Sequence, residues 1–385
     1  MNWTIRAVGT ATLVAMGVPA AEREPRAECT PTGAGVCRYV DPAGNDADPG
    51  TRERPYRTLQ KAADAVGPGD MVIVRSGSYT GGSIILEITR SGTPVNPIVF
   101  AAEHKWGAVI DGRDNRSAVG IEIRGFHVRV QGFEVRGTSH YGIEAYRGGN
   151  VTVAQNHVHD VGRYCTSTTA GIAGINAYVS NLVIEQNLVH DIGRYADGER
   201  GCATTNTNWQ NHDHGIYHGI GDNVVIRNNV FYNLTRGWAI HRYEGSRVGV
   251  RNLEIVNNTF AGANPEEDGQ IIIASPVSGL LIANNIFYRP RGGGVRFETG
   301  WLSGTVANNL TFGAGLCSGT AKGLVFAGNL IDVDPRFVNP ARQDFRLEAD
   351  SPARGAGRPL PDLRDDFDRS ARPAGPPDLG AYQFR

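Results

Sequence analysis

The stretch 150–160, NVTVAQNHVHD, recurs along the chain with its polar and apolar positions in register. Further copies begin at Asn181 (NLVIEQNLVHD), Asn223 (NVVIRNNVFYN), Asn252 (NLEIVNNTFAG) and Gly279 (GLLIANNIFYR). Each copy has an alternating run rich in β-branched residues, then an Asn, then a second apolar pair. Alternation of period two predicts a strand with one buried face, and strand repeats of this length predict a solenoid.

One Asn recurs at the same place in every copy, and weaker copies (GTVANNLTF and GLVFAGNLI) continue the column. Its members are Asn156, Asn187, Asn229, Asn258, Asn285, Asn309 and Asn329. An Asn at the same turn of every coil tolerates left-handed backbone geometry and can hydrogen-bond to its neighbour in the next coil. We therefore interpret the column as structural and not as a binding site.

A second strand is predicted before each copy, in the segments 141–146, 173–178, 214–219, 238–243, 270–275 and 293–298. The third position of each segment is aliphatic and is expected to point inward, so the fourth points outward. The fourth-position column is Glu144, Asn176, Tyr217, His241, Ile273 and Arg296. The sixth position shares that face, with Tyr146, Tyr178, Gly219, Tyr243, Ser275 and Glu298. Adjacent coils lie about 4.8 Å apart, which predicts one continuous patch of aromatic, His and charged side chains.

With these repeats the chain resembles the right-handed parallel β-helix proteins of the pectate-lyase-like superfamily. Residues 39–81 (YVDPAGNDADPG and the following TRERPYRTLQKAADAVGPGDMVIVRSGSYTG) resemble their N-terminal entry, where a short helix, here 58–66, caps the open core. DPRFVNPARQDFRLEADSPARGAG followed by PPDLGAYQFR resembles their C-terminal closing segment, which we place at 332–385. The resemblance implies an all-β fold, a right-handed parallel β-helix solenoid forming a single domain over 39–385.

The N-terminal residues 1–21 combine one basic residue with a short apolar run and small residues, the pattern of a secretory signal peptide or leader. The run is too short to span a membrane. We therefore expect a secreted protein, located outside the cell or in the cell envelope. The formal net charge of -1 gives no global field that would favour nucleic acid. We expect a monomer, because no exposed hydrophobic patch is evident in the solenoid pattern.

Five cysteines fit an exported protein. Cys29 and Cys37 are close in sequence and could form a disulfide that pins a linker at 22–38. Cys165 and Cys202 could pair across a long insertion, which would leave Cys317 over. The chain contains no CxxC pair, so a zinc knuckle is not indicated.

One coil is overlong: the step from Asn187 to Asn229 exceeds the others, and the extra residues are mainly 193–211. This insertion leads directly into His212 and the segment HDHGIYHG. Long excursions from a rigid scaffold usually build binding sites. The richest part of the outward face and the longest insertion meet at the same coil, so we predict the functional site there.

The resemblance implies a polysaccharide as partner, because proteins of this type include polysaccharide lyases, glycoside hydrolases and epimerases. A lyase that acts on a uronate must remove the proton at C5, neutralise the carboxylate and protonate the leaving oxygen. The candidates are His241 or His214 as base, Tyr217 or Tyr243 as proton donor, and Arg242, Arg296 or a bound Ca²⁺ to neutralise the carboxylate. The residues expected to bind substrate are Glu144, Tyr146, Asn176, Tyr178, His212, Asp213, Trp238, Glu244 and Arg296.

The sequence departs from several lyases of the family, which use a lysine base. Its three lysines, Lys61, Lys105 and Lys322, all fall outside the predicted patch. A His/Tyr arrangement is therefore the lyase mechanism that we favour.

Two alternatives stay open. A glycoside hydrolase needs two carboxylates that flank the scissile bond, and Asp213, Glu244 and Glu144 are candidates. A glycan-binding protein without catalysis would use the same face.

Histidines also occur outside the predicted patch. His157, His159 and His190 repeat with the coil in NHVHD and NLVHD, and we interpret them as turn or stacking residues. His212 and His214 lack a defined third ligand, so the sequence does not define a metal site.

Overall fold

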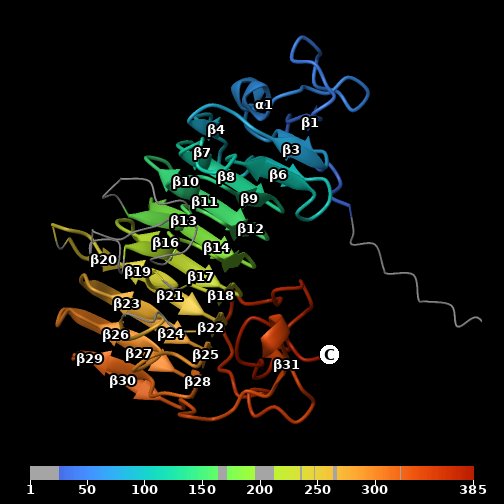
Figure 1. Ribbon diagram of the computed structural model, residues 1–385. Helices are drawn as coiled ribbons and strands as arrows, with labels where there is room; N and C mark the ends of the chain where they lie inside the picture. Colours follow the sequence, from blue (N-terminus) through green and yellow to red (C-terminus); the bar gives the residue numbers. More distant parts are fainter. Residues whose placement is uncertain are drawn as a thin grey trace, which may run out of the picture.

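The computed structural model describes residues 26–163, 171–195, 212–234, 236–246, 248–262, 267–320 and 322–385. The expected leader at 1–21, most of the insertion at 193–211 and the suggested pair Cys165–Cys202 lie outside these residues. Within them the chain winds as a parallel β-helix, in which each coil adds one strand to each of three sheets (Figure 1). None of the described helices is long and apolar enough to cross a membrane.

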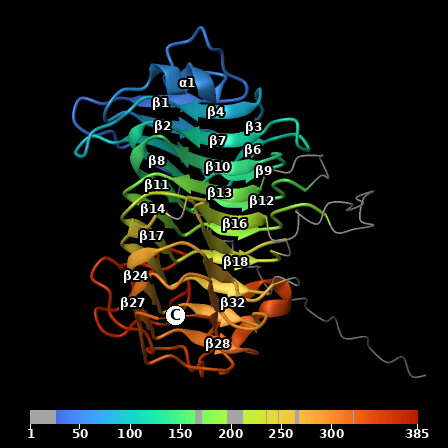
Figure 2. The same ribbon diagram turned by 90° about the vertical axis from the view of Figure 1, so that its left-hand side faces the viewer.

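The three sheets, here called A, B and C, run the length of the solenoid. Sheet A contains β1 (Cys37–Val40), β2 (Met71–Val74), β5 (Ile98–Ala102), β8 (Phe126–Gln131), β11 (Gly149–Ala154), β14 (Leu182–Glu185), β17 (Val224–Arg227), β21 (Leu253–Val256), β24 (Val277–Ala283), β27 (Leu302–Ala307) and β30 (Leu324–Ala327), with β20 (Val250–Arg251) beside β24. Sheet B contains β3 (Gly77–Tyr79), β6 (Ala108–Asp111), β9 (Glu134–Arg136), β12 (His157–His159), β15 (Leu188–His190), β18 (Val230–Tyr232), β22 (Thr259–Ala261), β25 (Ile286–Tyr288) and β28 (Leu310–Phe312). Sheet C contains β4 (Ile84–Ile88), β7 (Val119–Ile123), β10 (Tyr141–Tyr146), β13 (Ile172–Tyr178), β16 (Asp213–His218), β19 (Ile240–Arg242), β23 (Ile271–Ile273), β26 (Val295–Phe297) and β29 (Cys317–Gly319). Figure 2 shows the strands of sheet C stacked one above another.

The interior of the solenoid is a continuous apolar core, because the inward positions of every strand carry Val, Ile, Leu or Phe. Equivalent residues stack from coil to coil. Phe231, Phe260 and Phe287 lie with successive ring centroids 5.0 and 5.1 Å apart and nearly parallel planes. Such close packing fixes the position of each coil against the next.

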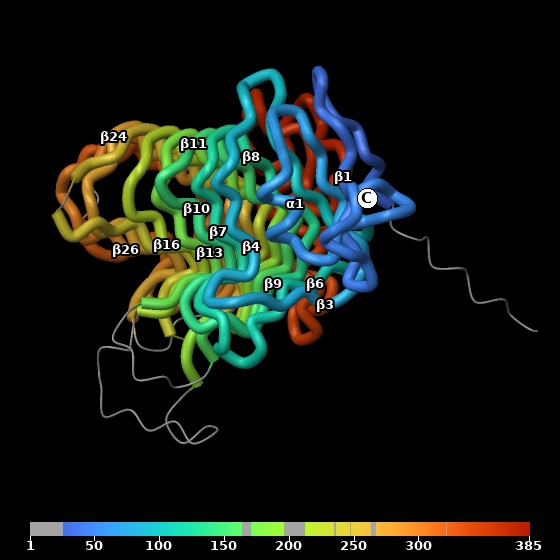
Figure 3. Tube along the Cα trace, turned by 90° about the horizontal axis from the view of Figure 1, so that it is seen from above, coloured from blue at the N-terminus to red at the C-terminus, as the bar shows by residue number. Residues whose placement is uncertain are grey.

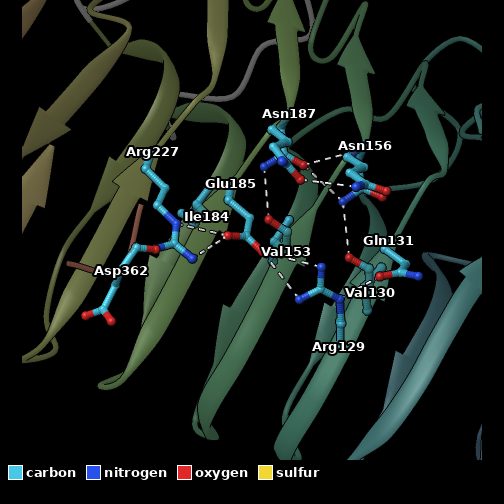
Figure 4. A network of polar contacts seen from close by, with 12 residues as sticks. Arg129, Val130, Gln131, Val153, Asn156, Ile184, Glu185, Asn187, Arg227 and Asp362 are labelled. Carbon is cyan, nitrogen blue, oxygen red and sulfur yellow. Dashed lines mark hydrogen bonds and ion pairs between the residues drawn. The ribbon is translucent and has the colours of Figure 1, made fainter. Parts of the chain in front are cut away.

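The predicted Asn column is confirmed as a ladder of buried side chains. The Oδ1 atom of Asn187 accepts hydrogen bonds from the backbone N–H (2.9 Å) and the Nδ2 (3.1 Å) of Asn156. Asn229 does the same for Asn187, at 2.9 and 3.0 Å (Figure 4 shows the first of these steps). The pattern continues through Asn258, Asn285 and Asn309 to Asn329.

The left-handed backbone geometry belongs to the residue before each ladder Asn, not to the ladder Asn itself. Positive φ occurs in an outer column at Gln155, Gln186, Asn228, Asn257, Asn284 and Asn308. The ladder residue itself turns inward, where its amide replaces backbone partners that the turn cannot supply. The expectation that the ladder Asn adopts the left-handed conformation was therefore wrong by one position.

The N-terminal end of the solenoid is closed by helix α1 (Leu59–Ala65), within the predicted range 58–66. The hydroxyl of Thr58 caps the helix by accepting from the backbone N–H of Lys61. Buried residues of one helix face, such as Leu59 and Ala62, belong to the same apolar core as the first coils, and α1 lies over that end when the molecule is viewed from above (Figure 3). A disulfide joins Cys29 to Cys37, and Cys317 is a free, exposed thiol.

The C-terminal segment does not close the opposite end of the solenoid, contrary to our expectation for 332–385. It contains β31 (Phe337–Asn339), a 3₁₀ helix (Pro340–Arg342) and β32 (Asp344–Leu347), and it packs along the flank of the coils beside β18, β22 and β25 (Figure 1). The side-chain amides of the outer column hold it by donating to its backbone carbonyls, from Gln186, Asn228, Asn257, Asn284 and Asn308. The last coil stays partly open, because Phe326, which is in register with the core residue Val306, is 41% exposed.

Arg227 makes a further link of this kind and extends it across sheet A. Its guanidinium donates to the carbonyl of Asp362 and pairs with Glu185, and Glu185 pairs in turn with Arg129 (Figure 4).

The outward column of sheet C differs from the predicted one at a single coil. Ile240 pairs with Ile271 and His241 with Ile272, so the outward residue after His241 is Ile272 and not Ile273. Arg296 is in register with Ile272. The segment QIIIAS contains three consecutive isoleucines, so its sequence does not show which of them points inward.

Candidate functional site

A cavity of about 250 Å³ opens on the outward face of sheet C, over β10, β13, β16 and β19. Its lining residues are Tyr141, Gly171, Ile172, Ala173, Asn176, Tyr178, His212, His214, Tyr217, His241 and Tyr243. Seven of these were predicted from the sequence: Asn176, Tyr178, His212, His214, Tyr217, His241 and Tyr243. The patch that the repeat predicts is therefore a real concavity.

Two histidines at the floor of the cavity form a hydrogen-bonded pair. His214 Nε2 lies 2.9 Å from His241 Nδ1, and the backbone N–H of Trp238 donates to His214 Nδ1 at 3.2 Å. Because a backbone N–H can only donate, His214 Nδ1 must carry a lone pair and His214 Nε2 must carry the proton. His214 then donates to His241 Nδ1, which leaves the remaining proton of neutral His241 on Nε2.

Burial keeps both imidazoles neutral. Desolvation, followed by the charge of His212 and then Arg242, lowers the pKa of His241 to about 3. Desolvation, followed by the neighbouring His241, lowers the pKa of His214 well below its usual value. The pair therefore offers the cavity an N–H donor at His241, not a free basic nitrogen.

Two tyrosines stand beside this pair. The rings of Tyr178 and Tyr217 are stacked with centroids 6.0 Å apart, and their side chains share a hydrogen bond. Burial raises the pKa of both phenols, whereas the charge of Arg242 acts in the opposite direction on each. Gly219 permits this packing, because a Cβ at that position would lie 2.4 Å from Cζ of Tyr178.

Arg242 does not face the cavity, which corrects its predicted role in neutralising a substrate carboxylate. The side chain is fully buried, since it takes the inward position that alternates with His241. Its guanidinium donates to the carbonyls of Gly219 (2.5 Å) and Val248 (2.9 Å). Arg242 therefore acts on the tyrosines through its charge, from beneath the strand.

Asp213 is also buried, with 0% exposure, and the structure corrects its predicted role in substrate binding. Its Oδ2 accepts from the backbone N–H of Arg194 at 2.9 Å, and its Oδ1 lies 3.7 Å from Arg194 Nη1. Burial raises the pKa of this carboxyl to about 6. Asp213, the first residue of β16, thereby links this strand to Arg194.

The carboxylate pair suggested for a hydrolase is not assembled. Ile216 pairs with Ile240, so Asp213 and Glu244 are separated by seven positions along the strand direction, about 20 Å. Glycosidase carboxylates lie roughly 5–10 Å apart. Glu244 instead accepts from Ser246 and from the backbone N–H of Val248.

The other predicted residues lie around the cavity without lining it. Trp238 is 6% exposed, packs behind His214 and donates through Nε1 to the carbonyl of Asp268. Tyr146 continues the aromatic face, edge-on to Tyr178 at 6.2 Å. Arg296 is occupied by ion pairs with Glu267 and Glu298.

Glu144 lies one coil from Asn176 and accepts from its Nδ2 at 2.8 Å. It is in register with Glu122, which is in turn in register with Glu87. Burial, followed by the charge of Glu122 and opposed by the Asn176 hydrogen bond, raises the pKa of Glu144. The sequence analysis missed this row of glutamates, although the Glu at the fourth position of β10 marks its end.

Tyr141 was also missed. It is the first residue of β10, is partly exposed and lines the cavity together with Asn176. Burial, followed by the charge of Glu144, raises the pKa of Tyr141 to about 12. The signal was available, because the first, fourth and sixth positions of the segment YGIEAY are all polar or aromatic.

The described residues of the cleft do not fit a bound Ca²⁺. Calcium takes about six to eight oxygen ligands, usually several carboxylates. Within the described ranges, no three carboxylates lie close enough together to hold one ion. In the glutamate row, Arg124 already pairs with Glu122 and with Glu87, at 3.2 Å for the latter.

Comparison with known proteins gives two family matches. The model of the family described as "Pel9A-like, right handed beta helix region" matches residues 38–252, and that of "Right handed beta helix region" matches residues 195–334. Among curated proteins, the uncharacterized protein YwoF of Bacillus subtilis is 36% identical over 86 residues, 22% of this chain. Pectate lyase PEL9 of Emericella nidulans is 38% identical over 76 residues, 20% of this chain. Each match spans 18% of the relative's length.

A solved structure, that of pectate lyase Pel9A, superposes with a TM-score of 0.60 at 16% sequence identity. The match covers 92% of this chain and 98% of that one. At this identity the likeness shows a common fold, which agrees with the observed coils.

Proposed function

Because the chain belongs to the Pel9A-like family of right-handed β-helix proteins, we propose that it is a lyase that cleaves a uronate-containing polysaccharide by β-elimination. Two relatives described as pectate lyases support a polyuronate as the substrate class. Such polymers are too large to enter a cell intact, so we also propose that the protein is secreted. The observation that carries the proposal is the juxtaposition of a fixed His241 N–H and a hydrogen-bonded tyrosine pair in one cavity.

His241 is assigned as the group that neutralises the carboxylate. Its Nε2–H points away from His214 and is available to donate to a uronate carboxylate as negative charge builds up there. A neutral imidazole is an effective donor in this role because it gives a hydrogen bond without competing for the proton of the substrate. This assignment reverses the expectation that His241 or His214 is the base.

The tyrosine pair is assigned the proton transfers. The phenolate of one tyrosine removes the C5 proton, the C4–C5 double bond forms and the bond from C4 to the glycosidic oxygen breaks. The phenol of the other tyrosine donates its proton to that leaving oxygen. The two phenols then exchange one proton through the hydrogen bond that joins Tyr178 and Tyr217, which restores the starting state.

No lysine of the described chain reaches this cavity. Lys61 lies on α1, Lys105 packs over Trp106 and Phe367, and Lys322 is in the last coil. The lysine base of several family lyases has no counterpart here, which supports the tyrosine assignment.

The test is a screen of the purified chain against polygalacturonate, alginate, glycosaminoglycans and neutral glycans, with and without Ca²⁺. Ultraviolet absorbance of unsaturated uronates and new reducing ends are followed in parallel. A lyase produces both signals together, and we expect the rate to rise with pH because burial raises both phenol pKa values. Tyr217→Phe and Tyr178→Phe should each lower kcat by about 10²–10⁴-fold, and His241→Ala by about 10²–10³-fold.

The matched control is Tyr39→Phe, which removes a partly exposed phenol on β1, outside the cavity lining, and should leave kcat unchanged. Reducing ends without absorbance would overturn the lyase proposal in favour of hydrolysis. A glycan that binds without being cleaved would show that the cavity is a glycan-binding surface without catalysis. Full activity in Tyr217→Phe and Tyr178→Phe would refute the tyrosine mechanism while leaving the reaction class intact.

A further inference from the structure

Three histidines converge on the outward face of sheet B, away from the cavity described above. His157 and His159 lie on β12, and His190 lies on β15 in register with His159. His157 Nε2 and His190 Nε2 are 2.7 Å apart, and the rings of His159 and His190 are stacked with centroids 5.1 Å apart. One ligand nitrogen from each of the three residues lies within 4.8 Å of the others.

Two neighbouring carboxylates fix which nitrogen is free. Asp160 Oδ2 lies 2.7 Å from His159 Nδ1, and Asp191 Oδ2 lies 2.6 Å from His190 Nδ1. A carboxylate at this distance holds a proton on Nδ1, which leaves the lone pair on Nε2. Metal-binding histidines are commonly oriented in this way, because the carboxylate raises the basicity of the ligand nitrogen. The two aspartates thus orient the imidazoles of His159 and His190 in the same way.

Aromatic rings on both sides shield the group from water. Trp106 packs on His157 with ring centroids 4.8 Å apart, and Tyr232 stacks on His190 at 4.4 Å. This packing holds the ring planes of His157 and His190 in place beside His159.

A fourth ligand is within reach. Glu134 Oε1 lies 3.3 Å from His159 Nε2, and it also contacts Arg136 at 3.1 Å. Three imidazoles with a carboxylate or water suit a tetrahedral Zn²⁺ site.

We propose that His157, His159 and His190 form a zinc site on sheet B, completed by Glu134 or water. The metal joins β12 to β15 and so links two successive coils of sheet B. The linked strands end directly before Asp160 and Asp191. Its role is structural, since the site lies on a different sheet from the cavity.

The test uses the full chain after dialysis against a chelator. Calorimetry with ZnCl₂ should give one ion per chain, CoCl₂ should produce the visible bands of tetrahedral cobalt, and Zn²⁺ should raise the melting temperature. His190→Gln should weaken zinc binding by at least about 100-fold, and Asp191→Asn by about 10–100-fold with all three imidazoles in place. The control His104→Gln removes an exposed histidine on the surface and should bind zinc as the parent does.

The absence of binding at millimolar Zn²⁺ would overturn the proposal, as would equal affinity in His190→Gln and the parent. If His190→Gln does not fold, the zinc affinity of Asp191→Asn tests the proposal instead. The metal-free melting temperature of each variant shows whether it is folded before metal is added.

Discussion

Replacing Asn229 with Ala tests whether the buried Asn ladder holds the coils together. Asn229 Oδ1 accepts from the backbone N–H (2.9 Å) and Nδ2 (3.0 Å) of Asn187, and its Nδ2 donates to Ile184 O (2.9 Å) and Asn258 Oδ1 (3.0 Å). The Ala variant loses all four hydrogen bonds.

The cost follows from which partners are left without a bond. Asn187 Nδ2 keeps its bond to Val153 O, and Asn258 Oδ1 keeps the backbone N–H of residue 229. The backbone N–H of Asn187 loses its ladder partner in a fully buried position. The buried donor left unsatisfied costs about 1–3 kcal/mol and each of the other three bonds about 1 kcal/mol net, so we expect a loss of about 4–6 kcal/mol.

Urea unfolding followed by circular dichroism measures this loss. Asn329→Ala is the matched control, because Asn329 ends the ladder and is partly exposed, so water can replace its bonds. We expect the control to lose about 1 kcal/mol. Equal costs at the two positions, or a cost below about 1 kcal/mol for Asn229→Ala, would refute the reasoning.

Two further predictions concern the region of the cavity. Burial lowers the pKa of His218 from 6.5 to about 3 in the folded protein. As pH falls from 6.5 towards 3, His218 is therefore protonated in the unfolded chain but not in the folded one, and the free energy of unfolding decreases. In urea titrations over this range, His218→Gln should flatten the slope by up to about 1.4 kcal/mol per pH unit; an unchanged slope would contradict the pKa. Gly237→Ala should abolish the proposed lyase activity, because a Cβ there would lie 2.2 Å from the backbone O of Asp213 and 2.5 Å from His214 Nδ1 and would break the bond of His214 to Trp238. Gly67→Ala, with open space around it, should keep that activity. Activity in Gly237→Ala would show that the His pair is dispensable.

The repeat in the sequence was sufficient to predict the coils and most of the cavity. Each coil repeats the same inward and outward alternation, so Asn176, Tyr217 and His241 could be placed in one column before any contact was known. The triple isoleucine at 271–273 lacked that alternation, and the predicted column slipped there by one residue.

Other features depended on contacts between distant segments. Arg242 occupies a position that two earlier coils fill with Ala145 and Ala177. Only the turn carbonyls around it explain why a charge is buried there. The C-terminal segment 332–385 packs on the flank of the coils because the side-chain amides of the outer column, from Gln186 to Asn308, are spaced to meet its backbone carbonyls. The local sequence pattern does not show that these amides bond to carbonyls in a segment far away in the sequence.

Because of the Asn ladder, the solenoid can be lengthened or shortened only by whole coils without loss of ladder hydrogen bonds. Every internal coil presents the same Asn acceptor to one neighbour and the same donors to the other. A whole coil inserted or deleted between two ladder residues would preserve all these bonds, whereas a partial coil would leave buried donors without partners. Each added coil would also lengthen the outward face of sheet C by about 4.8 Å. If sheet C binds the proposed polysaccharide, the number of sugar subsites changes in steps of one coil, without any redesign of the core.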